Sequence, residues 1–290
     1  RPRGRPAAMA GGAQGRPLSL AENLLASGSA VVAATILTHP IDVVKVRLQL
    51  ADKGSARADS FSVARFLRMF PALHSEGGAA AFRAGWRSGA VRAATYGTAR
   101  IGLCDPLEQR FGSKTGGALA AGVLATVLGN PFEVLKVRLQ ARPQEAARGE
   151  SQAMAAMLRE EGPSALARGF HWAAARSAAL TASQVVPYAR AKQSLRPAVG
   201  GDGVLLHLLA SLVAGVVTCT VTSPLDVMKT RVMNAARSRE SPGVGALLRQ
   251  EGVMVFFKGW LANYVRIGPQ TLFIFVFYEQ TRRCVAAFRA

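Results

Sequence analysis

Three copies of one charged motif are spread along this 290-residue sequence. Each copy runs proline, any residue, an acid, two apolar residues, a lysine, any residue and an arginine. The copies are PIDVVKVR from Pro40, PFEVLKVR from Pro131 and PLDVMKTR from Pro224. An acid and a base three residues apart share a helix face and can pair locally. If three such helices surround one axis, each lysine can instead pair with the acid of a neighbouring helix. The ring would contain Asp42, Glu133, Asp226, Lys45, Lys136 and Lys229.

A ring of this kind would act as a gate that opens and closes. Charges buried in a membrane are costly unless they are paired, and a closed ring pairs all of them. The prolines Pro40, Pro131 and Pro224 predict kinks that tilt the following half of each helix toward the axis. The alternative is a charge cluster that only ends a membrane helix, but three copies with identical spacing favour the gate.

Three further arginines, Arg92, Arg176 and Arg266, interrupt otherwise apolar stretches. Each lies 13 residues before the acid position of a second charged pattern, which is described below. In a helix, 13 residues span about 20 Å, so the three arginines should lie near the middle of the membrane. Arginines at that depth are rare, so we expect them to face a central cavity and bind an anion. Each can hold a carboxylate through two parallel hydrogen bonds, which suits a dicarboxylate. The alternative for the three arginines is that their side chains snorkel to the membrane surface or pair with a helix carbonyl. Arg100 is an additional candidate for binding the anion.

The elements that must position these residues are membrane helices. Half of the residues are hydrophobic and 18% are charged, and the mean hydropathy is +0.18. Lysine and arginine outnumber acids by 36 to 17, which in an apolar chain favours anionic lipids or an anionic substrate. A basic soluble enzyme or nucleic-acid binder is the alternative. No phosphate-binding loop, zinc spacing or nucleophile elbow supports it, so we expect no catalytic site, no metal site and no cofactor.

The chain is organised as three tandem repeats. Uncharged stretches at 23–41, 115–132 and 203–225 are long enough to cross a bilayer, and the prolines near their ends are 91 and 93 residues apart. Less apolar stretches follow at 86–107, 170–191 and 260–281. The pattern predicts six membrane helices in repeats at 20–113, 114–199 and 200–290. Weakly amphipathic segments at 61–74, 152–160 and 244–250 are predicted to lie at the interface. Residues 1–19 are basic and predict a targeting or flexible extension.

The triplicated motif resembles the signature of the mitochondrial carrier family, and the resemblance covers about residues 20–283. It implies an all-α, six-helix barrel with pseudo-threefold symmetry and short amphipathic matrix helices. It also implies a multi-pass protein of the mitochondrial inner membrane that acts as a monomer, alternates access between cytosol and matrix, and carries a small anion. Cardiolipin is implied at Arg83, Arg168 and Lys258 with the glycines that follow them.

The resemblance also implies specific gate partners. At the matrix gate it pairs Asp42 with Lys136, Glu133 with Lys229, and Asp226 with Lys45. The family braces this gate with glutamines four residues past the lysines. Gln49 and Gln140 match these positions, whereas Met233 stands at the third.

At the cytosolic gate the family carries an aromatic-acid-x-x-base pattern near the end of each even helix. Only the sixth helix keeps it whole, as Tyr278, Glu279 and Arg282. The remaining positions that can contribute are Tyr188, Lys192 and Asp105. Asp105 and Lys192 could pair, so we expect a weak cytosolic gate and a disfavoured cytosol-closed state.

Local sequence places the chain near one branch of the family. RAATYGTARIGLCD from Arg92 and RIGPQTLFIFVFYEQ from Arg266 resemble dicarboxylate, oxoglutarate and uncoupling carriers. Exchange of dicarboxylates such as malate, succinate and oxoglutarate is therefore the leading functional hypothesis. Proton or anion transport of the uncoupling type is the alternative, and no motif or charge count separates the two.

Overall fold

The computed structural model describes residues 20–51, 61–199, 204–235 and 243–287, and every regular element within these ranges is a helix. The predicted extension at 1–19 lies outside the described residues. Six helices are long, and short ones connect them in pairs. The long helices are α1 (Leu20–Leu50), α3 (Trp86–Phe111), α4 (Lys114–Ala141), α7 (Phe170–Val199), α8 (Val204–Asn234) and α10 (Trp260–Ala287). The short ones are α2 (Val63–Phe82), α5 (Pro143–Ala147), α6 (Glu150–Glu161), η2 (Pro163–Ala167), α9 (Val244–Glu251) and η4 (Val253–Phe257).

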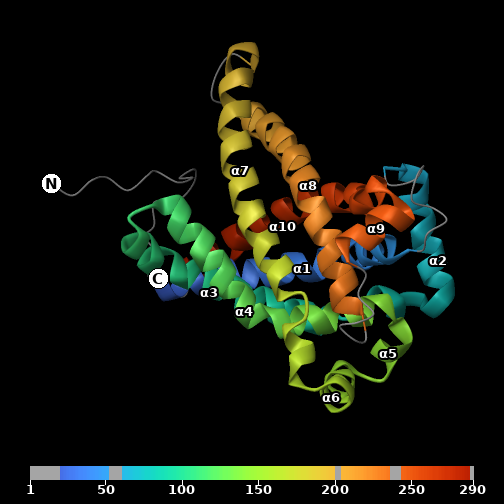
Figure 1. The fold of residues 1–290 in the computed structure, drawn as a ribbon. Coiled ribbons are helices and arrows are strands. Elements are labelled where there is room, and N and C mark those ends of the chain that lie inside the picture. Colours follow the sequence, from blue (N-terminus) through green and yellow to red (C-terminus); the bar gives the residue numbers. More distant parts are fainter. Residues whose placement is uncertain (1–19, 52–60, 200–203, 236–242, 288–290) are drawn as a thin grey trace.

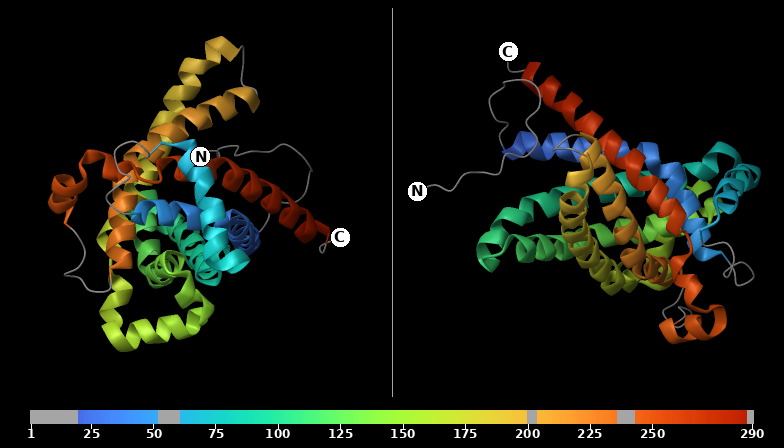
Figure 2. Two further views of the ribbon diagram at one scale, coloured as in Figure 1. Left: turned by 90° about the vertical axis from the view of Figure 1, so that its right-hand side faces the viewer. Right: turned by 90° about the horizontal axis from the view of Figure 1, so that it is seen from above.

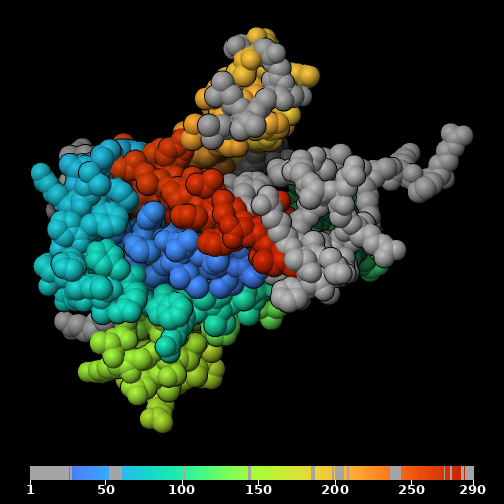
Figure 3. All heavy atoms as spheres, turned by 180° about the vertical axis from the view of Figure 1, so that it is seen from behind, coloured from blue at the N-terminus to red at the C-terminus, as the bar shows by residue number. Residues whose placement is uncertain are grey.

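The long helices close a ring in chain order. α1 packs against α3, α3 against α4, α4 against α7, α7 against α8, α8 against α10, and α10 returns to α1. Figure 3 shows α1 lying between α10 and the helices of the α3 region on one face of the molecule. Each repeat therefore contributes one odd and one even helix of the ring, which is the pseudo-threefold arrangement expected from the sequence.

Among the described residues, three helical segments are long and apolar enough to cross a membrane: Gly28–Leu50, Lys114–Ala141 and Leu209–Asn234, all on odd members of the ring. The even helices α3, α7 and α10 have 26, 30 and 28 residues. At 1.5 Å per residue they are roughly 40 Å long or more, so their length is also sufficient to cross a bilayer. The odd helices expose apolar side chains such as Leu37, Leu128 and Val217 on the outside. A lipid-facing surface requires such side chains.

The two ends of the ring differ. We call the end with the α3–α4 and α7–α8 turns, where α1 begins and α10 ends, the terminal end, and the other the short-helix end. At the terminal end the α3–α4 and α7–α8 hairpins point in different directions (Figures 1 and 2). At the short-helix end, buried apolar clusters pack the short helices against the odd helices, for example Leu73 and Phe66 of α2 with Val43 and Val44 of α1. The ring is therefore spread at one end and packed at the other.

Glycines on α4 let its neighbours approach closely. A Cβ atom added at Gly122 would lie 2.7 Å from Ser177 Oγ on α7, and one at Gly129 would lie 3.4 Å from Tyr96 Cβ on α3. Side chains of α3 and α7 consequently meet across α4, with Tyr96 Oη and Ser177 Oγ 3.1 Å apart. Small residues at helix contacts have this role in membrane bundles.

The short helices extend further than the amphipathic segments predicted from the sequence. The predicted segments 61–74, 152–160 and 244–250 correspond to α2, α6 and α9, and α2 continues to Phe82. It does so across a break at Gly77 and Gly78, where Gly78 has a φ of 57°. A glycine without a Cβ adopts this left-handed conformation at little cost, so the helix changes direction there.

Candidate gate and anion site

Three ion pairs cross the ring near the short-helix end, and each joins two odd helices. Lys136 Nζ lies 2.6 Å from Asp42 Oδ2, Lys45 Nζ 2.8 Å from Asp226 Oδ2, and Lys229 Nζ 2.5 Å from Glu133 Oε1. These are the pairs that the resemblance to the carrier family implies. All six side chains are largely buried, with exposed fractions of 12% or less. The ring of charges therefore ties α1, α4 and α8 together at the closed end of the barrel.

Each acid of this ring also holds an arginine from an even helix. Arg266 Nη1 lies 2.6 Å from Asp42 Oδ1, and Arg92 Nε lies 3.2 Å from Glu133 Oε1. Arg176 Nε donates a hydrogen bond to Asp226 Oδ1. The carboxylates thus sit between two cations, which offsets the cost of burying them. We call the nine side chains together the charge layer: Asp42, Lys45, Arg92, Glu133, Lys136, Arg176, Asp226, Lys229 and Arg266.

The charge layer connects all three repeats at every acid. Asp42 belongs to repeat 1 and receives Lys136 from repeat 2 and Arg266 from repeat 3. Glu133 and Asp226 each bind one lysine and one arginine in the same way. Opening the short-helix end must therefore break contacts to carboxylates that both lysines and arginines hold.

The arginine contacts were not anticipated. From the sequence we expected Arg92, Arg176 and Arg266 to lie in an open cavity and await an anion from outside. The structure instead places each beside an acid of the gate. The anions that these arginines contact are carboxylates of the chain itself. The charge layer lines a partly open cavity of about 90 Å³.

Arg100, two turns further toward the terminal end of α3, contacts a neutral group. Its Nη2 donates a hydrogen bond of 3.2 Å to Thr181 Oγ1 on α7. One turn closer to the charge layer, Tyr96 and Ser177 form the contact already described. Polar side chains of α3 and α7 therefore meet at two levels between the charge layer and the terminal end.

The two glutamines expected to brace the gate behave differently. Gln49 Oε1 accepts a hydrogen bond of 2.8 Å from Thr230 Oγ1, next to Lys229. Gln140 is fully buried, and neither its Nε2 nor its Oε1 has a partner among the described residues. Met233 takes the third position as a buried apolar side chain. A glutamine thus contacts a residue beside the ring at one of the three positions.

One gate lysine has an additional partner that the sequence did not suggest. Lys45 Nζ donates a hydrogen bond of 2.9 Å to Asn263 Oδ1, and Asn263 Nδ2 donates in turn to Cys219 Sγ at 3.4 Å. Asn263 lies three residues before Arg266, and the corresponding residues before Arg92 and Arg176 are Gly89 and Ala173. Because neither of those can accept a side-chain hydrogen bond, the gate is asymmetric at Lys45.

Residues predicted for the cytosolic gate lie near the spread terminal end of the even helices. Tyr188 Oη and His207 Nδ1 on α8 are 2.6 Å apart, so this aromatic residue contacts its own hairpin partner. Asp105 and Lys192 lie on α3 and α7, and Tyr278 and Glu279 on α10. The side chain of Arg282 lies outside the described residues.

Acidic side chains of the short helices bind the arginine that ends the charged motif. Glu161 forms ion pairs with Arg138 and Arg168, and Glu251 with Arg231 and Lys258. Hydrogen bonds from Arg231 lower the pKa of Glu251 from 4.5 to about 2. Burial acts in the opposite direction, and a hydrogen bond from Lys258 adds to the lowering. Burial opposes ionisation of Glu161 too, but Arg138 and Arg168 outweigh it and lower its pKa.

Two cations that the resemblance assigns to cardiolipin are therefore engaged within the chain. Arg168 Nη1 also donates to the carbonyl of Ala235, and Lys258 Nζ to the carbonyl of Ala51. Each ties the start of an even helix to the end of an odd helix from another repeat. The third cation, Arg83, is the C-cap residue of α2.

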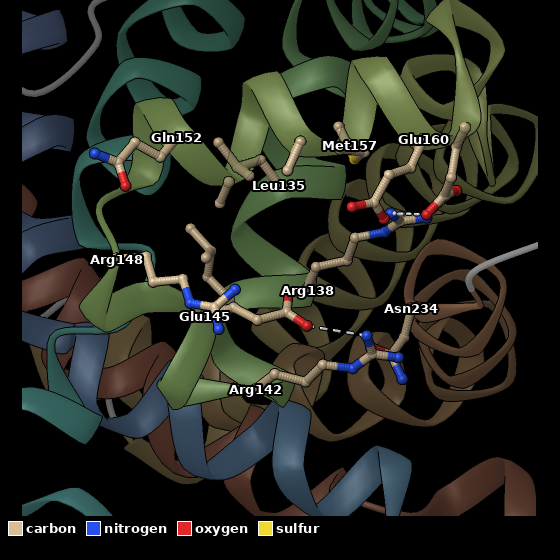
Figure 4. Close-up of a pocket in the computed structure, with 13 residues that line it drawn as sticks. Leu135, Arg138, Arg142, Glu145, Arg148, Gln152, Met157, Glu160 and Asn234 are labelled. Atoms are coloured by element: carbon tan, nitrogen blue, oxygen red, sulfur yellow. Dashed lines mark hydrogen bonds and ion pairs between the residues drawn. The ribbon is translucent and has the colours of Figure 1, made fainter.

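A separate pocket of about 340 Å³ lies outside the ring, between the end of α4 and α5 and α6 (Figure 4). Leu135 and Met157 lie on its apolar side, and Arg142 and Arg148 on its polar side. Arg142 is paired with Glu145 at 3.0 Å. The described residues contain no group of three or more His, Cys, Asp or Glu side chains that could hold a metal ion.

In the described residues, six long helices form a ring that is spread at one end and has a buried charge layer near the other, which is the arrangement expected of a membrane carrier. The profile of the family described as mitochondrial carrier protein matches residues 16–115, 108–198 and 201–287. The chain belongs to the mitochondrial carrier family. It is a transporter of the mitochondrial inner membrane rather than an enzyme.

Several relatives are similar along nearly their whole length. The mitochondrial citrate transporter F of Aspergillus niger is 36% identical over 277 residues, covering 88% of this chain and 87% of the relative. The human mitochondrial 2-oxoglutarate/malate carrier protein is 31% identical over 300 residues, covering 94% and 95%. The sheep mitochondrial brown fat uncoupling protein 1 is 30% identical over 284 residues, covering 92% and 93%. We call the short-helix end the matrix end, because the resemblance to the family assigns the acids and lysines of the charge layer to its matrix gate.

Proposed function

We propose that this carrier exchanges small anions with at least two carboxylate groups, first of all dicarboxylates such as malate, succinate and oxoglutarate. The observation that carries the proposal is the second partner of each gate acid. Arg92, Arg176 and Arg266 already bind carboxylates, each supplied by the chain. The site is therefore built for carboxylate groups at three positions around one axis.

A substrate carboxylate competes directly with a gate acid for the same guanidinium. When Arg266 turns to a substrate, Asp42 keeps Lys136 alone. The substrate gains charge-assisted hydrogen bonds while the ring loses them, so binding weakens the closed matrix end. A ligand shifts a conformational equilibrium only through such differential contacts. A substrate that engages two arginines loosens two acids at once, which favours anions with more than one carboxylate.

Arg100 gives the substrate a first contact on this route. Its partner Thr181 is a neutral hydroxyl group, and a carboxylate binds a guanidinium more strongly than a hydroxyl does. An anion entering from the cytosol can thus displace Thr181 before it reaches the charge layer. The hydroxyl and phenol of Ser177 and Tyr96 lie one turn below and can follow the substrate.

Relatives support two related substrates and one different activity. Two of them are named for citrate and for 2-oxoglutarate and malate, whereas the uncoupling protein is named for another function. Citrate carries a third carboxylate and a hydroxyl group, so it belongs in the same test. Proton or anion transport of the uncoupling type is the second candidate, supported by the similarity to the sheep protein.

The test is a transport screen with the purified full-length protein in liposomes. We expect malate-loaded liposomes to take up external malate, succinate, oxoglutarate or citrate faster than liposomes without internal substrate. Phosphate and a monocarboxylate serve as comparison substrates. Proton flux that depends on fatty acid, without any exchange of carboxylates, would overturn the proposal in favour of the second candidate.

Two arginines on the same helix provide a matched pair of variants. Arg176→Ala should abolish exchange while the protein remains folded and in the membrane, because Arg176 binds Asp226 in the charge layer. Arg190→Ala should leave exchange unchanged, because Arg190 is exposed near the terminal end. Equal loss of exchange in both variants would contradict the assignment of Arg176 to the substrate site.

A further inference from the structure

The first turn of α3 is bound by a carboxylate from another repeat. Glu150, the first residue of α6, accepts hydrogen bonds from the backbone N–H groups of Arg87 at 3.1 Å and of Ser88 at 2.7 Å. The hydroxyl of Ser88 donates a third hydrogen bond to the same carboxylate. The N-cap residue of α3, Gly85, has no side chain that could cap the helix. Glu150 therefore takes the place of a cap.

The start of a helix is a natural site for an anion. Its first N–H groups have no partner within the helix, and the helix dipole adds a partial positive charge there. Phosphate groups commonly bind at such positions. In α3 the two N–H groups that a phosphate would need are already satisfied by Glu150.

The other two short helices of this kind begin with a different residue type. Where α6 begins with Glu150, α9 begins with Val244 and α2 with Val63, and a valine side chain cannot accept a hydrogen bond. Aligned on the glutamate–glycine pairs of the repeats, Glu150 corresponds to Arg65 in repeat 1 and to Glu240 in repeat 3. Glu240 lies outside the described residues. Repeat 1 therefore carries a cation where repeat 2 carries the capping carboxylate.

The surroundings of Glu150 would suit a phosphate if the carboxylate were removed. A pocket of about 270 Å³ lies beside it, lined by Arg83, Trp86 and Arg87 together with Ala146, Ala147 and Gly149. Arg83 and Arg87 line this pocket next to the N–H groups of Arg87 and Ser88, which removal of the carboxylate would leave without their partner. A phosphate could approach from the pocket and occupy the position of the carboxylate.

We propose that Glu150 is a built-in anion that occupies the start of α3 in place of a lipid phosphate, and that it ties repeat 2 to repeat 1 without any lipid. The resemblance to the carrier family leads to the opposite expectation, a bound cardiolipin beside Arg83. The chain's own carboxylate competes for that position.

The bound turn also touches the gate. His39 Nε2 donates a hydrogen bond of 2.9 Å to the carbonyl of Ala84, directly before α3. A Cβ atom at Gly85 would lie 3.0 Å from the carbonyl oxygen of Lys136, so the helix start packs closely against α4. Glu150 consequently holds α3 against two helices that carry gate residues, and it supports the closed matrix end on one of its three sides.

Amide hydrogen exchange of the full-length protein in detergent micelles tests this role. In the wild type, the amides of Arg87 and Ser88 should be protected, and added cardiolipin should not change their exchange. In Glu150→Ala they should exchange at least about tenfold faster, which corresponds to about 1.4 kcal/mol of lost protection, and cardiolipin should restore much of it. Native mass spectrometry of the same samples should detect one more cardiolipin on the variant than on the wild type.

Controls separate the carboxylate from general destabilisation and a lipid from a free anion. Glu145→Ala removes a nearby acid that pairs with Arg142 on the surface, and it should behave as the wild type. Glu150→Gln keeps the side-chain shape without the charge and should lie between the wild type and Glu150→Ala. Restored protection with inorganic phosphate alone would contradict a lipid as the competing ligand. Cardiolipin that protects these amides equally in the wild type and in Glu150→Ala, or in neither, would overturn the proposal.

Discussion

The strongest prediction concerns the arginines that share the gate acids, and Arg266→Gln tests it. Arg266 contributes an ion pair of 2.6 Å to Asp42, whose side chain is only 5% exposed. A hydrogen bond to a charged group contributes about 1.5–3 kcal/mol. Because about 1.4 kcal/mol corresponds to a factor of ten, loss of this contact should raise the population open to the matrix by about 10- to 100-fold.

A native cysteine reports this opening. Cys219 is fully buried and accepts a hydrogen bond from Asn263, which also binds Lys45 of the gate. With Cys104 and Cys284 replaced by serine, the rate at which a thiol reagent modifies Cys219 measures how often this region opens. We expect Arg266→Gln to raise that rate by about tenfold or more in the absence of substrate.

Arg100→Gln is the matched control. Arg100 is also an arginine of an even helix, but its contact is the hydroxyl of Thr181 at 3.2 Å. The variant should weaken substrate binding, seen as a higher KM for exchange, and leave the labelling rate of Cys219 within about a factor of two, because a neutral contact contributes less than an ion pair. If both variants raised the labelling rate equally, or if neither did, the idea that Arg266 strengthens the matrix gate would be refuted.

Three further predictions concern individual contacts of the same region. Exchanging the charges of one pair, as Asp42→Lys with Lys136→Asp, should support more transport than either single change and less than the wild type, since a lysine at position 42 would face a gate arginine. Asn263→Ala should increase the transport rate at the expense of thermal stability, because Lys45 loses a partner in the closed state; an unchanged melting temperature would contradict this. The lowered pKa of Glu251 means that its ionised form stabilises the fold above about pH 5 and that this contribution is lost as the pH falls toward about 2. Melting temperatures of the wild type should therefore fall more steeply between about pH 5 and pH 3 than those of Glu251→Gln.

A ring of ion pairs could be predicted from the sequence because its residues repeat. Three identical spacings made a local explanation improbable, and the cost of buried charge required partners for Asp42 and its equivalents. The same reasoning predicted the three repeats, and hydropathy alone predicted the odd helices. The even helices were predicted less clearly, because arginines such as Arg92 interrupt their apolar stretches.

The arginine contacts could not be predicted because they depend on the axial register between neighbouring helices. Counting residues along α10 fixes the depth of Arg266 relative to Glu279, but it says nothing about its height relative to Asp42 on α1. Glu150 was missed for a different reason. It lies in none of the triplicated motifs, and a single acid at the start of a short surface helix carries no signal until the helix is placed beside α3.

The composition of the charge layer has a consequence for ion discrimination. It contains six cationic side chains and three carboxylates, so three positive charges remain in excess within a largely buried region. The excess positive charge repels small cations from the charge layer, whereas a divalent or trivalent anion neutralises that charge. The membrane voltage, negative on the matrix side, acts on that same excess whenever the helices move, at about 2.3 kcal/mol per elementary charge per 100 mV. Exchange of two anions of unequal valence should therefore respond to voltage, while exchange of equal ones should not.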